Sequence, residues 1–590
     1  MSSSAERVIA VVGAGPRGTS FLERLLAHIE QIAPNDRPRL RIKVFDPAPH
    51  GPGKVWNPEQ SPLYLMNTPA SYPTAAPTGE TQEALPASSC SMSFMDYATL
   101  NGLKYDDADF PARAHYGHYL AWLSKEVSAR LRGRGAAVEH IAAEVTALRQ
   151  HQCGYRMQTE GSWHQADAVV LALGHLAAEP SGPSGRLART AAEAGLHYQG
   201  AAIPTDVDYD DFPAAENVLV RGMGLNFFDL LIQLTVGRGG QFEEHHDAGP
   251  GSRYDYLPSG REPVIIAGAR RGTPYRAKTT AKGVVPAVVE LEHLTQQRID
   301  QLLEQRTQLD FVENLWPLIQ ADALVVYRRA GGTDAAFDVD DYAHPFAHRT
   351  FTSHADYQQQ MRSWLVEDAT SAQAAERSPE KMALNAVHAA RLRIKPLLTQ
   401  GLITAASRLH DVEGWFESLI EGLASGPPLQ RIEELAALVR AGVVEFLGPD
   451  PVYGVDRKDG RFIADSAAVA GARYTAQHMV EAMMPPNRIT QAGSPLVTDM
   501  LSSGLARPAS FDVDSETHVH KGFDVSGQPY RLLDCQGQPV GGVYVLGLQL
   551  SSVQWGTAIA AEAGGEAHVT AQTLADADAV ARDLLEQLTD

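Results

Sequence analysis

The sequence has little cysteine and no long apolar run. Its 590 residues include 3 cysteines, Cys90, Cys153 and Cys535, and none stands in a CxxC pair or at a metal-ligand spacing. This argues against a structural metal site and against the dithiol chemistry of disulfide reductases, and it predicts a reducing, cytoplasmic compartment. No stretch reaches the roughly 18 apolar residues that a membrane span needs, and the short polar start, 1–6, predicts no signal peptide.

Positive charge is scarce as well. Lys and Arg total 50 against 71 Asp and Glu, a formal net charge of -21. Such a chain repels a polyphosphate backbone, so we expect no nucleic-acid partner. The GxSxG elbow of esterases and the FxGxxxHxxxW run of Baeyer-Villiger monooxygenases are both missing. The length predicts more than one domain.

What the sequence does contain is two glycine-rich turns far apart in the chain. The first, Gly13-Ala14-Gly15-Pro16-Arg17-Gly18, lies between a predicted buried strand, 7–12, and a predicted helix, 19–32. Glycines at this spacing allow a tight turn, a close approach of pyrophosphate and close packing of helix on strand, and the helix N-terminus attracts the phosphates. The next strand ends at Asp46, whose carboxylate would accept the ribose hydroxyls of an adenosine.

Two further segments favour FAD at this first turn. Val145 lies in a strand-like run, 138–148, and would contact the adenine. Leu171-Ala172-Leu173-Gly174 closes a predicted strand, 168–173, of the kind that passes under the cofactor in flavoproteins with two dinucleotide sites. An ordinary sheet strand with a turn glycine is the alternative.

The second turn, Gly222-Met223-Gly224-Leu225-Asn226-Phe227, follows a predicted strand, 217–221, and opens a helix. Phe227 replaces the third glycine, so we expect this helix to pack further from its strand. After the next strand, Arg270 and Arg271 stand where a ribose-binding acid would be. Arginines there suit an adenosine 2′-phosphate, which predicts NADPH rather than NADH; a solvated basic patch is the alternative.

These motifs resemble the FAD/NAD(P)-binding family related to flavin-dependent N-hydroxylating monooxygenases. The resemblance covers nearly the whole chain and includes four more segments: Gly51-Pro52-Gly53-Lys54-Val55-Trp56, Leu65-Met66-Asn67-Thr68-Pro69, 110–117 and 548–557. It implies an α/β, Rossmann-like flavoprotein with two dinucleotide sites. It also implies an enzyme that uses FAD, NADPH and dioxygen to hydroxylate an amino-acid amine through a flavin C4a-hydroperoxide. Some relatives convert L-aspartate to nitrosuccinate in natural-product biosynthesis.

Roles for single residues also follow from the resemblance. Trp56 and Asn67 are expected to act at the isoalloxazine ring, with Lys54 and Thr68 beside them; plain loop residues are the alternative. Trp555, Gly556 and Thr557 are expected to place a helix N-terminus near the flavin N1–C2 edge, where it would stabilise negative charge. For a carboxylate substrate the candidates are Arg113, Arg276 and Lys278, with surface salt bridges as the alternative.

The middle of the chain has a different pattern. Helical spacing dominates at 288–303, 357–364, 379–398 and 432–441, which predicts a large helical insertion. We therefore expect a discontinuous FAD-binding domain, 1–200 and 488–590, an NADPH-binding domain, 201–284, and a mainly helical insertion, 285–487. The insertion is either a lid or a surface for homo-oligomer formation. The run Glu243-Glu244-His245-His246-Asp247 is interpreted as a solvated turn rather than a metal site.

Two other functions stay open on the sequence. A flavin-dependent reductase or dehydrogenase would use the same cofactors without inserting oxygen. A non-catalytic nucleotide-sensing protein would bind them without turnover. Motifs that bind nucleotides do not identify the substrate, because the reactive chemistry belongs to the cofactor.

Overall fold

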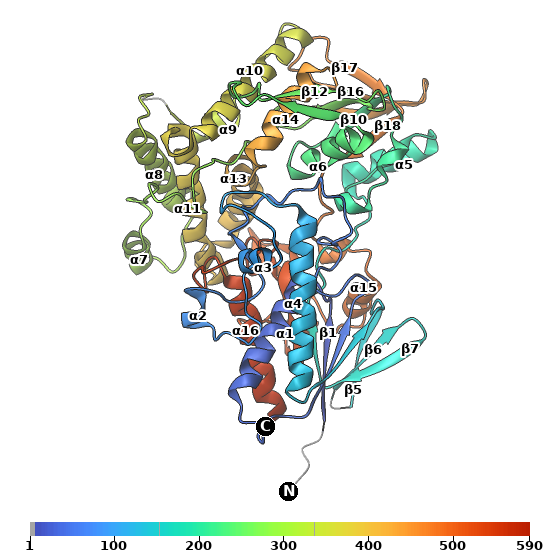
Figure 1. The fold of residues 1–590 in the computed structure, drawn as a ribbon, viewed down its shortest axis with the longest axis vertical. Helices are drawn as coiled ribbons and strands as arrows, with labels where there is room; N and C mark the ends of the chain where they lie inside the picture. The colour runs from blue at the N-terminus through green and yellow to red at the C-terminus, as the bar shows by residue number, and fades with distance from the viewer. Residues whose placement is uncertain (1–5, 153, 335–336, 590) are drawn as a thin grey trace. The chain divides into compact units, whose positions relative to one another are not determined.

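The structure is a computed structural model that describes residues 6–152, 154–334 and 337–589; Cys153 lies outside these ranges. The chain forms two compact units, shown along the ribbon in Figure 1. Unit 1 comprises Met1–Glu179 and Pro486–Asp590, and unit 2 comprises Pro180–Pro485. Among the described residues, no helix is both long and apolar enough to cross a membrane.

Unit 1 is built on a six-stranded sheet with the order β21-β22-β8-β1-β2-β4. Strand β1 lies at its centre and pairs in parallel with β2 and β8, while β21 is antiparallel to β22. Side chains of β1 and β8 are buried on both faces, as expected for parallel strands covered on both sides. The strands are β1 (Arg7–Val12), β2 (Leu40–Phe45), β4 (Ala137–Ile141), β8 (Ala168–Leu171), β21 (Arg531–Leu533) and β22 (Pro539–Val545).

One face of this sheet is covered by three helices, α1 (Pro16–Gln31), α4 (Arg113–Gly133) and α16 (Gln572–Thr589). Helix α1 packs against both of the others, and they share one apolar core with the sheet. A second core, which includes Val145, lies between the sheet, α15 (Pro495–Ser502) and an antiparallel sheet. The remaining elements are β3 (Pro73–Thr74), α2 (Thr81–Ala84), α3 (Phe94–Leu100), β5 (Ala147–His151), β6 (Gly154–Thr159), β7 (Ser162–Ala166), β19 (Pro508–Val513), β20 (Glu516–Phe523) and β23 (Ala561–Glu562).

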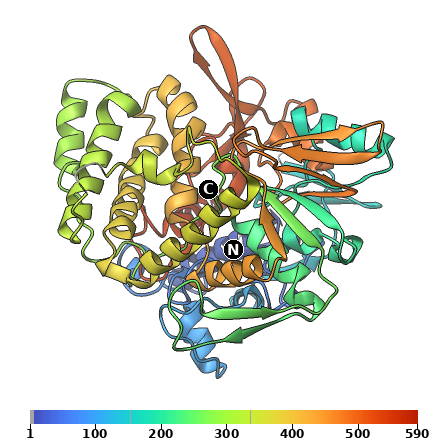
Figure 2. The same cartoon turned by 90° about the horizontal axis from the view of Figure 1, so that it is seen from above.

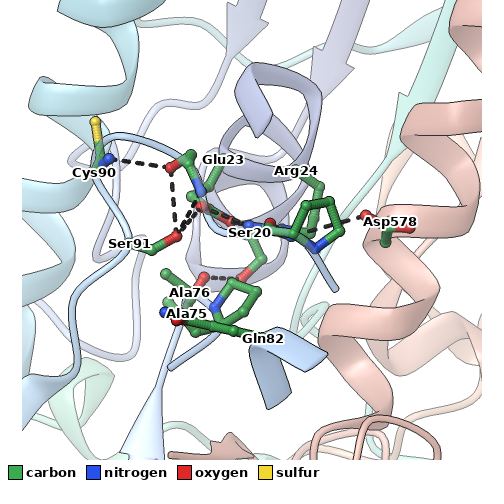
Figure 3. A network of polar contacts seen from close by, with 12 residues as sticks. Ser20, Glu23, Arg24, Ala75, Ala76, Gln82, Cys90, Ser91 and Asp578 are labelled. Atoms are coloured by element: carbon green, nitrogen blue, oxygen red, sulfur yellow. Dashed lines mark hydrogen bonds and ion pairs between the residues drawn. The ribbon is translucent and has the colours of Figure 1, made fainter. Parts of the chain in front are cut away.

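A buried polar network ties α1 to the C-terminal helix α16. Figure 3 shows Arg24, which is fully buried, between Glu23 and Asp578. Arg24 donates to both carboxylate oxygens of Glu23 at 2.6 and 2.7 Å and lies 3.8 Å from Asp578. Burial raises the pKa of Asp578, but hydrogen bonds from His28 and Arg582 and the charge of Arg24 outweigh it and leave that pKa below its ordinary value. Residues from the two ends of the chain thus share one charged core.

Unit 2 is built on a parallel sheet with the order β14-β13-β10-β18-β9. Its strands are β9 (His197–Gln199), β10 (Asn217–Arg221), β13 (Val264–Gly268), β14 (Val444–Phe446) and β18 (His478–Glu481). Helices of this unit include α5 (Gly182–Glu193), α6 (Leu225–Leu234) and α14 (Leu429–Arg440). An antiparallel sheet, β15 (Val452–Asp456), β16 (Arg461–Asp465) and β17 (Arg473–Ala476), and a hairpin, β11 (Gln241–Glu244) with β12 (Tyr254–Leu257), complete it.

The division into units differs from the predicted domains in two places. Residues 180–200, which we assigned to the FAD domain, supply α5 and β9 of unit 2. The stretch 285–487, which we expected to be mainly helical, supplies β14 and β18 of the central sheet. Both corrections have one cause: strands of three or four residues are too short for a periodic signal. Only their pairing identifies them, β9 with β18, β18 with β10 and β14 with β13.

The helical part of unit 2 lies between β13 and β14 in the chain, and Figure 2 shows it in green to yellow. Helix α11 packs along α8. The helices predicted over 357–364, 379–398 and 432–441 form within α10, α11 and α14, whereas the one predicted from 288 begins at Gln296. The helices are α7 (Gln296–Glu304), α8 (Trp316–Arg329), α9 (Val339–Ala343), α10 (His354–Gln373), α11 (Pro379–Thr399), α12 (Ala405–Ser407) and α13 (Glu417–Ala424), with π-helical stretches at Phe311–Leu315 and Arg408–Phe416.

Candidate active site

In the first glycine turn, backbone atoms leave no room for a side chain at Gly13 and Gly18, whereas Gly15 has open space beside it. Gly13 has a φ of +100°, and a Cβ there would overlap the carbonyl oxygen of Ala172; a Cβ on Gly18 would overlap the carbonyl oxygen of Gly13. The nearest atom to a Cβ on Gly15 is the Cα of Gly53, 3.8 Å away. Gly15 also forms the N-cap of α1, which begins at Pro16. This is the geometry in which a backbone and a helix N-terminus receive pyrophosphate.

Asp46 follows β2 and lies beside this turn. One carboxylate oxygen accepts from the amide of Ala14 at 2.7 Å and the other from the amide of Ala48 at 2.8 Å. Burial raises the pKa of Asp46, and these two hydrogen bonds oppose the rise. The acid therefore lies at the carboxyl end of β2, where a ribose-binding acid is required.

The loop that carries Lys54 and Trp56 lies between the first turn and α4. The amide of Gly51 donates to the carbonyl of Ala14 at 2.7 Å, and a Cβ on Gly117 of α4 would overlap the carbonyl oxygen of Trp56. The Trp56 ring meets Tyr116 edge-on, with 4.9 Å between ring centroids. Lys54 is exposed.

Asn67 and Thr68 belong to a segment that runs along the start of α4. The amide of Met66 donates to the carbonyl of Pro111, and the guanidinium of Arg113 donates to the carbonyl of Leu65 at 3.0 Å. Arg113 also lies over the Tyr64 ring, 5.5 Å from its centroid. The half-buried Asn67 and Thr68 thus lie next to the start of α4.

The expected helix at Trp555, Gly556 and Thr557 does not form. The residues after Ser551 form turns, bends and the short strand β23, and the next helix, α16, begins only at Gln572. Because Gly556 has a φ of +74°, the chain leaves the α-helical region at the position where that helix would start. The helix end that contacts this segment is instead that of α1, since Arg17 donates to the carbonyls of Thr557 at 3.1 Å and Ile559 at 2.6 Å.

The other two residues of the predicted FAD site have different surroundings. Gly174 has a φ of +65°, a Cβ there would have no neighbour within 4 Å, and its carbonyl accepts from Gln549 at 2.9 Å. Val145 is buried in the second core of unit 1. The continuous strand predicted over 138–148 is wrong, because β4 and β5 belong to different sheets and Val145 lies in the bend that joins them.

The second glycine turn has the same place at the end of its sheet but different neighbours. Gly222 has a φ of +109° and its Cβ position lies 3.1 Å from the carbonyl oxygen of Ala482, just after β18. The Cβ position of Gly224 lies 3.3 Å from the ring of Tyr275, whose amide donates to Met223 at 3.0 Å. Phe227 is fully buried in α6. An aromatic ring therefore covers the glycine at which pyrophosphate would approach.

Of the other residues predicted to bind the nicotinamide nucleotide, the two arginines are not equivalent. Arg270 is exposed, whereas Arg271 is half-buried, donates to the carbonyl of Ser418 in α13 and lies over the Tyr275 ring. Burial lowers the pKa of Arg271. Arg270 is thus the one whose side chain lies in solvent. Leu225 begins α6, and Asn226 donates to the carbonyl of Ala202 at 3.3 Å.

The segment after Arg271 is held by a row of backbone hydrogen bonds. The amide of Arg276 donates to Gly422, that of Lys278 to Pro427 and that of Thr280 to Ala372. At the centre of this strap, residues 275–280, the amide of Ala277 donates to the fully buried carboxylate of Asp368 at 2.7 Å. The predicted substrate residue Lys278 therefore has a fixed backbone.

Arg276 is the other predicted substrate residue of the strap, and its side chain makes an ion pair, a hydrogen bond and a ring contact within unit 2. Its guanidinium lies 3.3 Å from Asp368, donates to the carbonyl of Tyr342 at 2.9 Å and lies 3.8 Å from the centroid of the Tyr342 ring. Lys381 of α11 completes the cluster, 2.8 Å from Asp368 and 2.5 Å from the carbonyl of Ala277. Sequence reasoning missed Asp368 and Lys381, because each is one polar residue within a long helix.

Lys278 interacts electrostatically with Arg391 of the same helix, α11. Burial and the charge of Arg391 lower the pKa of Lys278 to about 8. Burial and the charges of Arg391 and Lys278 lower the pKa of His388 to about 3. His388 and Arg391 were not predicted; the three-residue spacing that brings them to one face of a helix was the only available signal.

The run 243–247 is exposed as expected, but its first two residues belong to strand β11 rather than to a turn. His245 lies 3.0 Å from Asp255 across the β11–β12 hairpin, and Glu244 pairs with Arg253 at 2.7 Å. Within the described ranges, no group of three or more His, Cys, Asp or Glu residues has a geometry that could hold a metal ion.

Comparisons with known proteins identify the family to which this chain is related. Residues 10–176 match the family model described as FAD-NAD(P)-binding. The chain is 33% identical to a nitrosuccinic acid synthase of Aspergillus oryzae, over 98% of this chain and 92% of that protein. It is also 33% identical to an L-aspartate N-monooxygenase (nitrosuccinate-forming) of Streptomyces cremeus, over 97% of this chain and 94% of that protein.

The chain belongs to the family of nitrosuccinate-forming N-monooxygenases. It is therefore an oxidoreductase with FAD and a nicotinamide nucleotide as cofactors, and its fold is that of a Rossmann-like flavoprotein. The residues present fit FAD: Gly15 is open to a phosphate, α1 begins at that point, and Asp46 lies at the end of β2. The L-lysine 6-monooxygenase of Pseudomonas syringae is similar in structure at 14% identity and a TM-score of 0.46, covering 99% of each chain.

Proposed function

We propose that this protein oxidises the amine of L-aspartate to the nitro group of nitrosuccinate, with FAD, NADPH and dioxygen. The observation that carries the proposal is the identity of 33% to two relatives named for this product, over nearly the whole chain. The two glycine turns support it, since the reaction needs a flavin and a nicotinamide nucleotide that reduces it.

We assign the FAD to unit 1. Gly15 and the start of α1 would receive the pyrophosphate, and Asp46 the ribose. Trp56 and Asn67 are proposed to lie against the isoalloxazine ring, with Lys54 and Thr68 beside them. When bound and reduced, the FAD supplies the activation of dioxygen.

We assign the nicotinamide nucleotide to unit 2. Gly222 and Gly224 would hold its pyrophosphate, and Arg270, which is exposed, would pair with a 2′-phosphate. This favours NADPH, because a guanidinium and a phosphate form charge-assisted hydrogen bonds that the 2′-hydroxyl of NADH cannot match.

The protein's share in the reaction is to bind a small dianion and keep its amine in place. Lys278 is the cation of unit 2 that we assign to a substrate carboxylate, and Arg276 supports Lys278 through the cluster at Asp368. Orientation of this kind lowers the barrier without a catalytic side chain at the nitrogen.

The test is product formation by purified protein. With NADPH, air and L-aspartate we expect nitrosuccinate by mass spectrometry and faster NADPH oxidation than without an amino acid. L-Asparagine, L-glutamate and L-alanine are the controls. If NADPH is consumed at one rate whatever amino acid is present and no nitro product forms, the protein is a reductase and the proposal is overturned.

A further inference from the structure

The second glycine of the two turns has different surroundings in the two units. Gly15 and Gly224 each form the N-cap of the helix that follows the turn, α1 and α6 respectively. A Cβ on Gly15 would lie 3.8 Å from the Cα of Gly53, whereas a Cβ on Gly224 would lie 3.3 Å from ring atoms of Tyr275. This glycine is the one that lets the backbone approach a pyrophosphate. In unit 2 the Tyr275 ring therefore covers the place where that group would arrive.

The backbone that carries Tyr275 is fixed on both sides of the ring. The amide of Tyr275 donates to the carbonyl of Met223 in the turn at 3.0 Å, and the amide of Arg276 donates to the carbonyl of Gly422 in α13 at 3.0 Å. A Cβ on Gly426, just beyond α13, would overlap the carbonyl oxygen of Arg276. The ring can therefore leave the turn by rotation of the side chain, while the strap stays in place.

Helix α13 contacts both the ring and the cation beside it. The Tyr275 hydroxyl donates to the carboxylate of Glu421 at 3.4 Å. The guanidinium of Arg271 lies 5.8 Å from the centroid of the Tyr275 ring and donates to the carbonyl of Ser418. Gly422 leaves room for this guanidinium, because a Cβ there would overlap it. The three residues of α13 are spaced three and four apart, so one face of this helix holds the ring over the turn.

The contact between the ring and α13 is weak enough to be released. An O–H···O hydrogen bond is usually about 2.5–3.0 Å long, and the bond from Tyr275 to Glu421 is longer and ends on an exposed side chain. Burial raises the pKa of Tyr275 to about 12, so the hydroxyl keeps its proton at neutral pH and remains a donor. A phosphate that replaced the ring would gain the amides of the turn and the N-terminus of α6.

We propose that Tyr275 is a lid on the second glycine turn and that Glu421 of α13 is its latch. A nicotinamide nucleotide binds when its pyrophosphate takes the place of the ring. The apparent affinity is then the intrinsic affinity multiplied by the fraction of molecules whose lid is open. This inference rests on the proposed assignment of the nucleotide to unit 2. It gives the helical part of that unit a role, because α13 sets how often the turn is open.

The first experiment measures the binding of NADP⁺ to the FAD-loaded protein by calorimetry, with no amino acid present. Tyr275→Ala removes the lid, and we expect the Kd for NADP⁺ to fall about threefold or more because no ring has to be displaced. The matched control, Tyr254→Ala, removes a half-buried tyrosine of the β11–β12 hairpin and should keep the wild-type Kd. An unchanged Kd in Y275A would overturn the lid. A higher Kd would do the same, because the ring would then be a binding group for the nucleotide.

The latch is tested with two variants that remove one hydrogen bond from its opposite ends. Tyr275→Phe removes the hydroxyl and Glu421→Ala the carboxylate, so each should lower the Kd about twofold, the value of a weak hydrogen bond. The double variant should have no larger effect than either single one. Glu367→Ala, which removes an exposed glutamate from α10, should keep the wild-type Kd. Additive effects in the double variant would exclude this bond as the latch.

An association rate separates the lid from the proposed function. In anaerobic stopped-flow mixing with NADPH, Y275A and E421A should bind faster than the wild type, since a closed lid delays binding. If these differences appear and L-aspartate is not oxidised, the proposed function fails and the lid stands. If L-aspartate is oxidised and Y275A behaves like Y254A in both assays, the lid is overturned and the function stands. Absence of NADP⁺ binding in every variant would overturn both.

Flavin content and the melting temperature check that each variant is folded. If Y275A does not fold, Y275F and E421A decide, because the first keeps the ring and the second changes an exposed side chain. A wild-type Kd and a wild-type association rate in both would overturn the proposal.

Discussion

The two glycine turns occupy the same place in two parallel sheets and are closed by different means. In unit 1 backbone closes the turn, since Ala172 blocks a side chain at Gly13 and Gly13 blocks one at Gly18. In unit 2 the first glycine, Gly222, also faces backbone, 3.1 Å from Ala482, but a ring covers the second glycine, because Tyr275 lies 3.3 Å from the Cβ position of Gly224. The third position of this turn is Phe227. Backbone cannot move aside without unfolding, whereas a side chain can rotate.

This difference suits the two cofactors. An FAD that stays bound needs a permanent binding site. A nicotinamide nucleotide that enters and leaves in every turnover needs a binding site that can open. The same contrast extends to the first charged residue after the strand that follows each turn helix in its sheet. This residue is a hydrogen-bonded acid, Asp46, in unit 1 and a solvent-exposed cation, Arg270, in unit 2.

The largest effect is expected from alanine at the first glycine of each turn. Gly13→Ala combines a left-handed φ, about 1–3 kcal/mol, with overlap on backbone, about another 1–3 kcal/mol or more, so the protein should lose FAD and melt at lower temperature. Gly222→Ala, with 3.1 Å to Ala482, should keep FAD and raise the KM for NADPH. Flavin absorbance and steady-state kinetics measure both. Equal FAD loss in the two variants would contradict the contrast between the turns.

The buried carboxylates of the two units provide the next comparison. Asp578→Asn in unit 1 and Asp368→Asn in unit 2 each leave a buried arginine without its full counter-charge, which costs about 3 kcal/mol. In chemical denaturation followed by flavin fluorescence, D578N should release its FAD more readily than the wild type does. D368N should retain its FAD and should instead bind the substrate more weakly. Since the pKa of Asp578 is lowered in the folded protein, its stabilisation is present above the unfolded pKa and is lost as the pH falls through the folded pKa.

The two neighbouring arginines, Arg270 and Arg271, are expected to affect the cofactor preference differently. Arg270→Ala should cut the preference for NADPH over NADH, in kcat/KM, by roughly 10- to 100-fold, the value of one charge-assisted contact of about 1.5–3 kcal/mol. Arg271→Ala should leave the preference unchanged and lower stability, because Arg271 is bonded to Ser418. A preference that responds to R271A alone would reverse the assignment.

The smallest effect concerns pH. The pKa of Lys278 is about 8, with Arg391 and the neutral His388 as neighbours; the ammonium is therefore present below that pH and lost as the pH rises through it. The KM for L-aspartate should rise about fourfold from pH 7 to pH 8.5 as Lys278 loses its proton. Lys278→Arg, which stays charged, controls for titration of the substrate amine. A rise of the same size in K278R would exclude Lys278 as its cause.

Much of unit 1 could be predicted from sequence because its signals are local. Strands β1 and β2, the turn between β1 and α1, and Asp46 follow one another within a short stretch, and each is required by backbone geometry. The helix expected after Gly556 failed for the opposite reason: turns continue beyond this point, and the interaction that holds the segment, the bond from Arg17, comes from the other end of the chain.

By itself the sequence determined the two glycine turns, the cofactors that they imply and the family, because glycine spacing and strand patterns express what a short stretch of backbone needs. The tertiary structure decided that β14 and β18 join the second sheet, that Arg270 rather than Arg271 is exposed, and that Lys278 lies near His388 and Arg391. The physical reason is that charge compensation and burial depend on residues remote in the chain, and no local pattern encodes which of them meet.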